Sequence, residues 1–244
     1  MSEYILETQH LVMQFGGLIA TNDVSIRCRE HEIVGLIGAN GAGKTTLFNM
    51  ISGQLKPKSG KVIFKGNEIQ GSSPHQACRM GIGRTHQIVQ PFADLTVLEN
   101  VMVGALLKHA SVAVAREKAE AILEQVGLTP RRDVKGGDLN LPELKRMELA
   151  RALATEPELL LLDEVMAGLN PTDCQGVVEL ILRIRDSGMS IILIEHVMKA
   201  VMSLSDHLYV LNQGCLISQG SVEEVTNDPA VIASYLGEKK SAET

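Results

Sequence analysis

The stretch IVGLIGANGAGKT, residues 33–45, decides the fold of this chain. Its apolar start, Ile33 to Ile37, has the composition of a buried strand. Residues 38–45 fit the pattern G-x-x-x-x-G-K-[ST], and an amphipathic run from Thr46 to Ile51 follows. A strand, a tight loop and a helix in this order form a cradle whose backbone N–H groups and helix dipole bind phosphate oxygens. The stretch therefore predicts a phosphate-binding loop.

Side chains of this loop have separate expected tasks. Lys44 is long enough to reach the β- and γ-phosphates of a nucleotide, and the Thr45 hydroxyl can ligate Mg²⁺. Gly53 stands where a glycine after a helix is expected. An accidental glycine-rich turn is the alternative, but chance matches occur on the order of once in a hundred chains of this length. The expected phosphate-binding residues are Gly38, Asn40, Gly41, Ala42, Gly43, Lys44, Thr45 and Thr46.

Composition limits the classes of protein to which the chain can belong. Of its 244 residues 45% are hydrophobic and 3% aromatic, which predicts one large domain or two small ones with an aliphatic core. The formal net charge of −6 argues against non-specific binding of nucleic acid, so no nucleic-acid partner is expected. The cysteines lie far apart in the sequence, which favours reduced thiols over a disulfide framework or a zinc site.

The sequence shows no targeting or spanning segment. The N-terminus lacks a basic region followed by an apolar one, so no signal peptide is expected. No apolar stretch approaches the about 20 residues that a spanning helix needs. We therefore expect a cytoplasmic chain that reaches the membrane only through a partner.

Two regions near the N-terminus consist of short β-like runs. Val24, Ile26 and Cys28 alternate with polar residues, as in a half-buried strand. We expect residues 1–30 and 56–70 to form an antiparallel layer beside a parallel core. The expected strands are Tyr4–Thr8, Leu11–Phe15, Ala20–Arg27 and, after a turn at 56–60, Lys61–Phe64.

A helical block is expected over residues 90–155, between two β segments. Before it, Pro74–Met80 suits a short helix capped by Ser72 or Ser73, and residues 81–87 read as a strand that runs into a polar loop. Three segments of the block are helical by period: Val97–Leu107, Val112–Val126 (ended by Gly127) and Leu141–Thr155. The last is expected to bury Leu144, Met147, Leu149, Ala150 and Leu153.

The C-terminal part alternates buried strands with helices. Leu159–Leu162 and Ser190–Ile194 are continuous apolar runs, typical of strands buried on both faces. The other expected elements are helices at Pro171–Arg185, Val197–Leu204, Val222–Thr226 and Ala230–Tyr235, a hairpin of Leu208–Leu211 with Cys215–Ser218, and a polar tail from Glu238.

Polar side chains follow the buried strands. Because the carboxyl ends of parallel strands meet at one sheet edge, Asp163, Glu164 and His196 should lie near the phosphate loop. Asp163 is placed to hold Mg²⁺ through water, and Glu164 to orient or deprotonate an attacking water. His196 could donate to the γ-phosphate. The alternatives are a solvated loop start for the carboxylates and a surface or core position for the histidine.

This set of motifs resembles the ATPase subunits of ABC transporters over almost the whole chain, residues 1–244 as a single domain. The resemblance implies an α/β, RecA-like P-loop NTPase core with an antiparallel β subdomain and an α-helical subdomain, ATP and Mg²⁺ as cofactors, and ATP hydrolysis at a dimer interface. Phe15 matches the position that stacks on adenine, the alternative being a core phenylalanine. Gln87 matches the Q-loop glutamine, which touches Mg²⁺ and the lytic water. Residues 167–170 resemble the D-loop, and His196 matches the switch histidine.

Several longer stretches resemble one subgroup, the ATPases of branched-chain amino acid importers. They are QFGGLIATNDVS (14–25), GIGRTHQ (81–87), DEVMAGLNP (163–171), IEHVMKAVMSLSDHLYVLNQG (194–214) and SYLGE (234–238). The resemblance implies integral-membrane permease subunits, a substrate-binding protein as an indirect partner, and a peripheral position on the inner face of the cell membrane. ATPases of lipopolysaccharide exporters share part of the pattern and remain the alternative within transport.

The signature loop departs from the family. The family's Leu-Ser-Gly-Gly-Gln falls on residues 139–143, which read LNLPE. In the family this loop donates serine and glycine groups to the partner's γ-phosphate; Pro142 has no N–H and Glu143 adds a carboxylate, while Asn140 can still offer an amide in trans. We therefore expect a heterodimer with unequal ATP sites. Compensation by Lys145, Arg146 or a shifted backbone is the alternative. Two further departures, Val165 and His86, remove no catalytic group.

Other function classes fit less well. Soluble ABC ATPases of repair or translation usually carry two cassettes or a long coiled-coil insertion, and this chain has neither. A nucleotide sensor would be expected to lose Glu164 or His196. No N-K-x-D motif supports a GTPase.

Overall fold

A six-stranded sheet forms the centre of the computed structural model, which describes residues 3–87 and 90–234. Its strand order is β11-β10-β4-β9-β8-β7, and all neighbours are parallel except the β10–β11 hairpin. The strands are β4 (Ile33–Gly38), β7 (Ile82–Arg84), β8 (Leu159–Asp163), β9 (Ser190–Ile194), β10 (His207–Asn212) and β11 (Cys215–Gly220). The expected RecA-like parallel core is confirmed.

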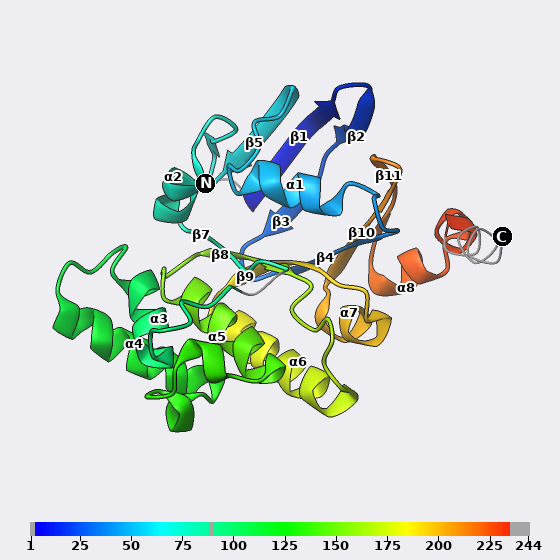
Figure 1. Cartoon of the computed structure of the whole chain (residues 1–244). Coiled ribbons are helices and arrows are strands. Elements are labelled where there is room, and N and C mark those ends of the chain that lie inside the picture. The colour runs from blue at the N-terminus through cyan, green and yellow to red at the C-terminus, as the bar shows by residue number, and fades with distance from the viewer. Residues whose placement is uncertain (1–2, 88–89, 235–244) are drawn as a thin grey trace.

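The two faces of this sheet pack into different cores because side chains alternate along each strand. In β8, Leu160 and Leu162 pack with the helices on one face, whereas Leu159 and Leu161 pack toward the other. Figure 1 shows the resulting layers: the antiparallel sheet with α1 above the central sheet, and the long helices below it.

The antiparallel sheet has the order β2-β1-β5-β6, and β3 also pairs with β1. Its strands are β1 (Tyr4–Phe15), β2 (Leu18–Val24), β3 (Arg27–Arg29), β5 (Ser59–Phe64) and β6 (Asn67–Glu68). The prediction of two strands before Phe15 was wrong: they form the single strand β1. His10, with φ 52°, makes a bulge that bends the strand without ending it. The run Ala20–Arg27 was likewise wrong as one strand, since β2 ends at Val24 and β3 begins at Arg27.

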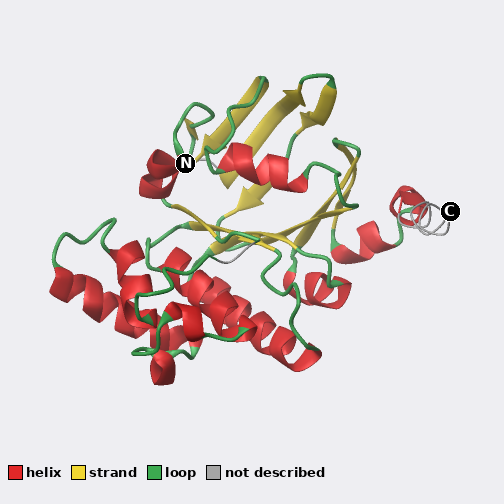
Figure 2. Cartoon of the chain, in the orientation of Figure 1, coloured by secondary structure: helices red, strands yellow, loops and turns green. Residues whose placement is uncertain are grey.

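Helices cover the central sheet on both faces, as Figure 2 shows in red. α1 (Lys44–Ile51) buries Leu47, Phe48, Met50 and Ile51 between the two sheets. The others are α2 (Pro74–Met80), α3 (Val97–Ala105), α4 (Val112–Val126), α5 (Leu141–Leu153), α6 (Pro171–Asp186), α7 (Met198–Leu204) and α8 (Val222–Thr226), with short 3₁₀ turns at Thr129–Arg131 and Gly136–Asp138. Residues 229–234 are helical as well.

Local sequence signals explain where several helices begin and end. Ser73 caps α2 with a reciprocal bond from Gln76, which decides between the two expected caps. Gly53 (φ 76°) and Gly127 (φ 74°) follow α1 and α4 in the left-handed conformation that favours glycine. α3 and α5 end two residues before their predicted ends, and α7 begins one residue later than predicted, which is the usual uncertainty of such boundaries.

Among the described residues no helix is both long and apolar enough to cross a membrane. Tyr235, most of the stretch 234–238 and the expected tail from Glu238 lie outside the described residues.

Candidate functional site

The phosphate loop lies between the two sheets and depends on glycine at two points. Gly38 has φ 145°, and a Cβ there would lie 2.0 Å from the carbonyl oxygen of Leu211. Gly43 has φ 103°, and its Cβ would lie 2.4 Å from the carbonyl oxygen of Ala20. The Lys44 ammonium donates to the carbonyl oxygens of Gly38 at 2.6 Å and Ala39 at 2.8 Å, so the loop holds its own lysine folded over it.

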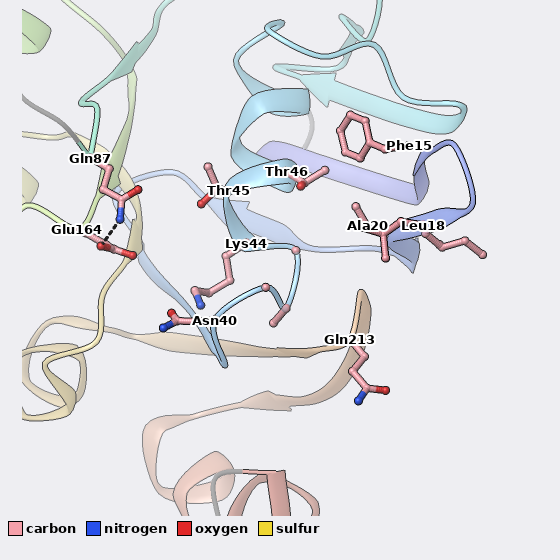
Figure 3. Close-up of a pocket in the computed structure, with 14 residues that line it drawn as sticks. Phe15, Leu18, Ala20, Asn40, Lys44, Thr45, Thr46, Gln87, Glu164 and Gln213 are labelled. Carbon is pink, nitrogen blue, oxygen red and sulfur yellow. Dashed lines mark hydrogen bonds between the residues drawn. The ribbon is translucent and has the colours of Figure 1, made fainter. Parts of the chain in front are cut away.

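A cavity of about 670 Å³ opens in front of this loop. Figure 3 shows Lys44 and Asn40 at its floor, Phe15 toward one end and the Gln87–Glu164 pair toward the other. The cavity also has Gly41, Ala42, Gly43, Thr45 and Thr46 in its wall; Gly38, Asp163 and His196 lie outside the lining. The structure thus brings nearly all expected phosphate-binding residues to one space.

Phe15 is a cavity residue and belongs to no core. It is 46% exposed and lies beside Leu18 and Ile19, which are also exposed, at the turn from β1 to β2. This excludes the alternative that Phe15 packs in the core. An exposed ring at one end of a phosphate cavity can stack on a planar base.

Glu164 stands at the other end of the cavity with both carboxylate oxygens engaged. Gln87 Nε2 donates to Oε2 at 2.7 Å, and His196 Nε2 lies 2.9 Å from Oε1. The three side chains come from the loop after β7, the end of β8 and the end of β9, as the sheet-edge argument predicts. Glu164 therefore does not stand alone at a solvated loop start. His196 does not pack in the core: its side chain is 44% exposed, so it lies at the surface, beside Glu164.

Asp163 ends β8 and is 1% exposed. Arg84 Nη2 donates to its Oδ2 at 3.0 Å, and the Asp163 N–H donates to Thr85 Oγ1 at 3.1 Å. Its Oδ1 has no partner among the described residues. Burial raises the pKa of Asp163, and the Arg84 guanidinium acts against this shift. An unpartnered buried carboxylate oxygen suits a water ligand of Mg²⁺, so the residues present fit that ion.

Arg84 is a site residue that the sequence reasoning missed. Its Nη1 atom donates to Asn49 Oδ1 at 2.7 Å and to Ser52 Oγ at 2.9 Å, both near the end of α1. The guanidinium therefore ties the metal-side carboxylate to the helix of the phosphate loop. The one available signal was a charged residue directly after the buried pair Ile82-Gly83 in a short strand.

Glu195 and Glu148 were missed as well, and Lys145 was named only as a possible compensation for the signature loop. Glu195 is 3% exposed and accepts from the N–H groups of Met166 at 2.8 Å and His196 at 3.3 Å. It thus connects the segment after Glu164 to the expected switch histidine. Lys145 and Glu148 are buried on α5, on the side expected to be aliphatic.

The signature loop caps its own helix. Asn140 Oδ1 accepts from the N–H of Glu143 at 3.0 Å, and the Glu143 carboxylate accepts from the Asn140 N–H at 3.1 Å. Arg131 pairs with that carboxylate at 2.8 Å. Of the first three residues of α5, Pro142 has no N–H and the N–H of Glu143 is used by the capping box. Only the N–H of Leu141 is left for another acceptor.

The alternative that Lys145 and Arg146 compensate is not seen within this chain. The Lys145 ammonium donates to carbonyl oxygens inside the fold, and Arg146 Nη1 donates to the Val126 carbonyl oxygen at 3.0 Å. The trans role of Asn140 stays a prediction.

Comparison with known proteins agrees with this geometry. Residues 21–167 match the family described as ABC transporter, and residues 215–240 match the one described as branched-chain amino acid ATP-binding cassette transporter. The chain is 42% identical over 254 residues to the high-affinity branched-chain amino acid transport ATP-binding protein LivG of Salmonella typhimurium, which covers 98% of this chain and 100% of the relative. It is 40% identical over 255 residues to BraF of Pseudomonas aeruginosa, which carries the same description, with the same coverage.

Solved structures give the same answer for the fold. An ATP-binding cassette of an ABC transporter in its ADP conformation superposes with a TM-score of 0.88 at 34% identity, covering 97% of this chain and 100% of that one. A nucleotide-free cassette gives a TM-score of 0.87 at 33% identity, covering 95% and 98%. With matches of this extent, the chain belongs to the ABC transporter ATP-binding family and is an ATPase of that family.

Proposed function

We propose that this chain is the ATP-hydrolysing subunit of an importer for branched-chain or other hydrophobic amino acids. The relatives that match it over their full length are described as branched-chain amino acid transport ATP-binding proteins. The observation that carries the catalytic part is the carboxylate of Glu164, held between Gln87 and His196 at the edge of the phosphate cavity.

Each side chain has a role that its position supports. Phe15 stacks on adenine, and the loop N–H groups with Lys44 bind the phosphates. Glu164 takes a proton from the attacking water, which Gln87 orients. His196 donates to the γ-phosphate oxygen on which charge develops. Thr45, Gln87 and Asp163 would hold Mg²⁺; when bound, this ion neutralises charge on the phosphates.

The partners follow from the same proposal. Permease subunits place the chain at the inner face of the membrane, and a binding protein delivers the substrate to them. A second, different ATPase subunit completes the site. The self-capped start of α5 supports this asymmetry, because it offers few free N–H groups to a nucleotide on the opposite subunit. The chain's own site keeps Lys44, Asp163, Glu164 and His196 and would be completed by the partner's loop.

Co-purification from membranes tests the assembly. Tagged full-length chain should bring along two permeases and a second ATPase, and the chain alone should hydrolyse Mg-ATP slowly. Rapid cooperative turnover by the chain as a homodimer would contradict the heterodimer.

Reconstitution tests the substrate. In liposomes, the assembled complex should hydrolyse ATP faster when leucine and its binding protein are added, and Lys44→Ala should remove this response. Stimulation by lipopolysaccharide instead would identify the exporter alternative. Hydrolysis without any permease partner at the full rate of the assembled complex would favour a soluble ATPase.

A further inference from the structure

Helix α5 buries a lysine and a glutamate whose partners lie in the catalytic loops. Lys145 is 6% exposed and Glu148 is 7% exposed. Three positions apart on a helix, they share one side of α5. A buried charge is costly unless it is paired or hydrogen-bonded, so the partners of these two groups indicate their task.

Lys145 binds the main chain of two site residues. Its Nζ atom donates to the carbonyl oxygen of Glu164 at 2.9 Å and to that of Gln87 at 3.4 Å. The side chains of the same two residues are hydrogen-bonded to each other at 2.7 Å. One ammonium group therefore holds the main chain of both Gln87 and Glu164, whose side chains form the pair at the end of the cavity.

Glu148 binds the residue just before Gln87. Its Oε1 atom accepts from the N–H of His86 at 2.7 Å. The two charged groups of α5 thus hold consecutive residues of one loop. The Glu148 carboxylate binds the N–H of His86, and the Lys145 ammonium binds the carbonyl group of Gln87. Each charge thus has the complementary backbone group as its partner, which makes all three hydrogen bonds charge-assisted.

Glu164 depends on such support because its backbone is unusual. Its φ is 51°, a left-handed value that is costly for a residue with a side chain. The Glu164 N–H donates to the Ile194 carbonyl oxygen at 2.9 Å, and the Glu164 carbonyl accepts from Lys145. Contacts on both sides of the residue therefore hold the direction in which its carboxylate points.

We propose that Lys145 and Glu148 are positioning residues for hydrolysis, which transmit the position of α5 to the main chain of Gln87 and Glu164. This inference rests on the catalytic roles proposed above for those two residues. Because α5 begins at the signature loop, a displacement of that loop shifts the carboxylate that activates water. Neither α5 residue lines the cavity in front of the phosphate loop, and Glu148 lines a second cavity together with Thr45, Gln87 and Asp163. We therefore expect the two residues to act on hydrolysis rather than on ATP affinity.

The principal test is Lys145→Met, which removes the ammonium but keeps an unbranched side chain. Single-turnover hydrolysis is measured with the full chain, assembled with its co-purified partners, in excess over labelled ATP. We expect a fall of about tenfold to 100-fold, as a small misplacement of a catalytic group produces. ATP affinity, measured separately by fluorescent-nucleotide titration, should not change. Lys145→Arg keeps a donor and should restore most of the rate.

The glutamate supplies a matched pair of variants. Glu148→Gln keeps an acceptor oxygen for the His86 N–H, although without the charge, and should retain most of the parental rate. Glu148→Met removes the acceptor and should lower the rate with unchanged ATP affinity. Lys199→Met, on an exposed position of α7, is the control for loss of a lysine and should behave like the parent.

Three outcomes overturn the inference. Lys145→Met could hydrolyse ATP at the parental rate, or it could lose ATP affinity and rate in parallel. It could also show only a lower unfolding temperature while the folded fraction keeps the parental rate, which would make the role structural. Glu164→Gln is measured in parallel. If Glu164→Gln retains the parental rate of hydrolysis, the proposed function fails as well. If Glu164→Gln loses activity while Lys145→Met keeps the parental rate, only the present inference fails.

Discussion

Arg84 and Asp163 form an ion pair of 3.0 Å in which the side chains are only 8% and 2% exposed. The pair joins the residue three positions before Gln87 to the residue just before Glu164. Asp163 keeps one oxygen without a partner among the described residues, and Arg84 binds the end of α1 with its Nη1 atom. The metal-side carboxylate is therefore oriented before any ligand arrives.

Removal of this arginine should destabilise the fold. Arg84→Met leaves the Asp163 carboxylate buried without its cation, which costs about 3–5 kcal/mol in the free energy of unfolding. Mg-ATP should restore part of the loss. Denaturant titration with and without Mg-ATP measures both effects. The double variant with Asp163→Asn should lose less than the sum of the single changes; additive losses would show that the pair is not coupled.

Phe15→Ala should weaken ATP binding by about 1–3 kcal/mol, the usual contribution of a base stacked on an aromatic ring. Phe15→Tyr keeps the ring and should bind ATP like the parent. Titration with inorganic tripolyphosphate is the control, because it has no base. Equal loss for ATP and tripolyphosphate would mean that Phe15 does not contact adenine.

Glu164→Gln should hydrolyse ATP about 10²- to 10⁴-fold more slowly than the parent, the usual contribution of a general base. The amide still accepts from Gln87, so the local structure and ATP affinity should persist. Phosphate release in single-turnover conditions measures the rate, and nucleotide titration measures the affinity. A variant as fast as the parent would exclude Glu164 as the base.

Much of this site could be predicted because its parts are short motifs at strand ends. The phosphate loop is contiguous in sequence, and Asp163, Glu164 and His196 follow apolar runs that can only be buried strands. Arg84 could not be assigned in this way, since its partner Asp163 lies 79 residues away in sequence. A charged residue in a buried element is recognisable only when the element that pairs with it is known.

The same limit explains α5 and β1. Helical period placed α5 correctly, but the burial of Lys145 and Glu148 depends on loops 19 and 62 residues distant. In β1 the prediction ended one strand at Thr8 and began another at Leu11, whereas the left-handed His10 let the pairing with β5 continue past it. Local propensity cannot predict a strand that continues only because it pairs with another strand.

Glu195 should make stability depend on pH. Burial raises its pKa above the usual value of 4.5, and N–H groups of Met166 and His196 oppose the shift. A raised pKa in the folded state gives stability that is present below pH 4.5 and is lost as the pH rises through the raised value. Glu195→Gln keeps an acceptor but no charge, so its stability relative to the parent should increase with pH. Denaturant titrations from pH 4 to about 8 measure this; a constant difference would contradict it.

Cys28 should be unreactive until the protein unfolds. Its side chain is fully buried, and burial raises the pKa of its thiol far above the ordinary value, whereas Cys215 is partly accessible. Because the thiolate is the reactive species, maleimide should label Cys215 in the native protein and Cys28 only in denaturant. Peptide mass spectrometry after timed labelling reads both sites. Equal native labelling would show that β3 opens readily.

The glycines of the phosphate loop have one further consequence. The absent Cβ of Gly38 faces β10 of the central sheet, and that of Gly43 faces β2 of the antiparallel sheet. Alanine at Gly38 would disturb the pairing of β4 with β10 within the central sheet, and alanine at Gly43 would push the phosphate loop away from β2, in both cases before any ligand is involved. A genetic screen that scores growth alone would count both positions as nucleotide contacts, although the first defect would lie in the packing of the phosphate loop against its neighbouring strands.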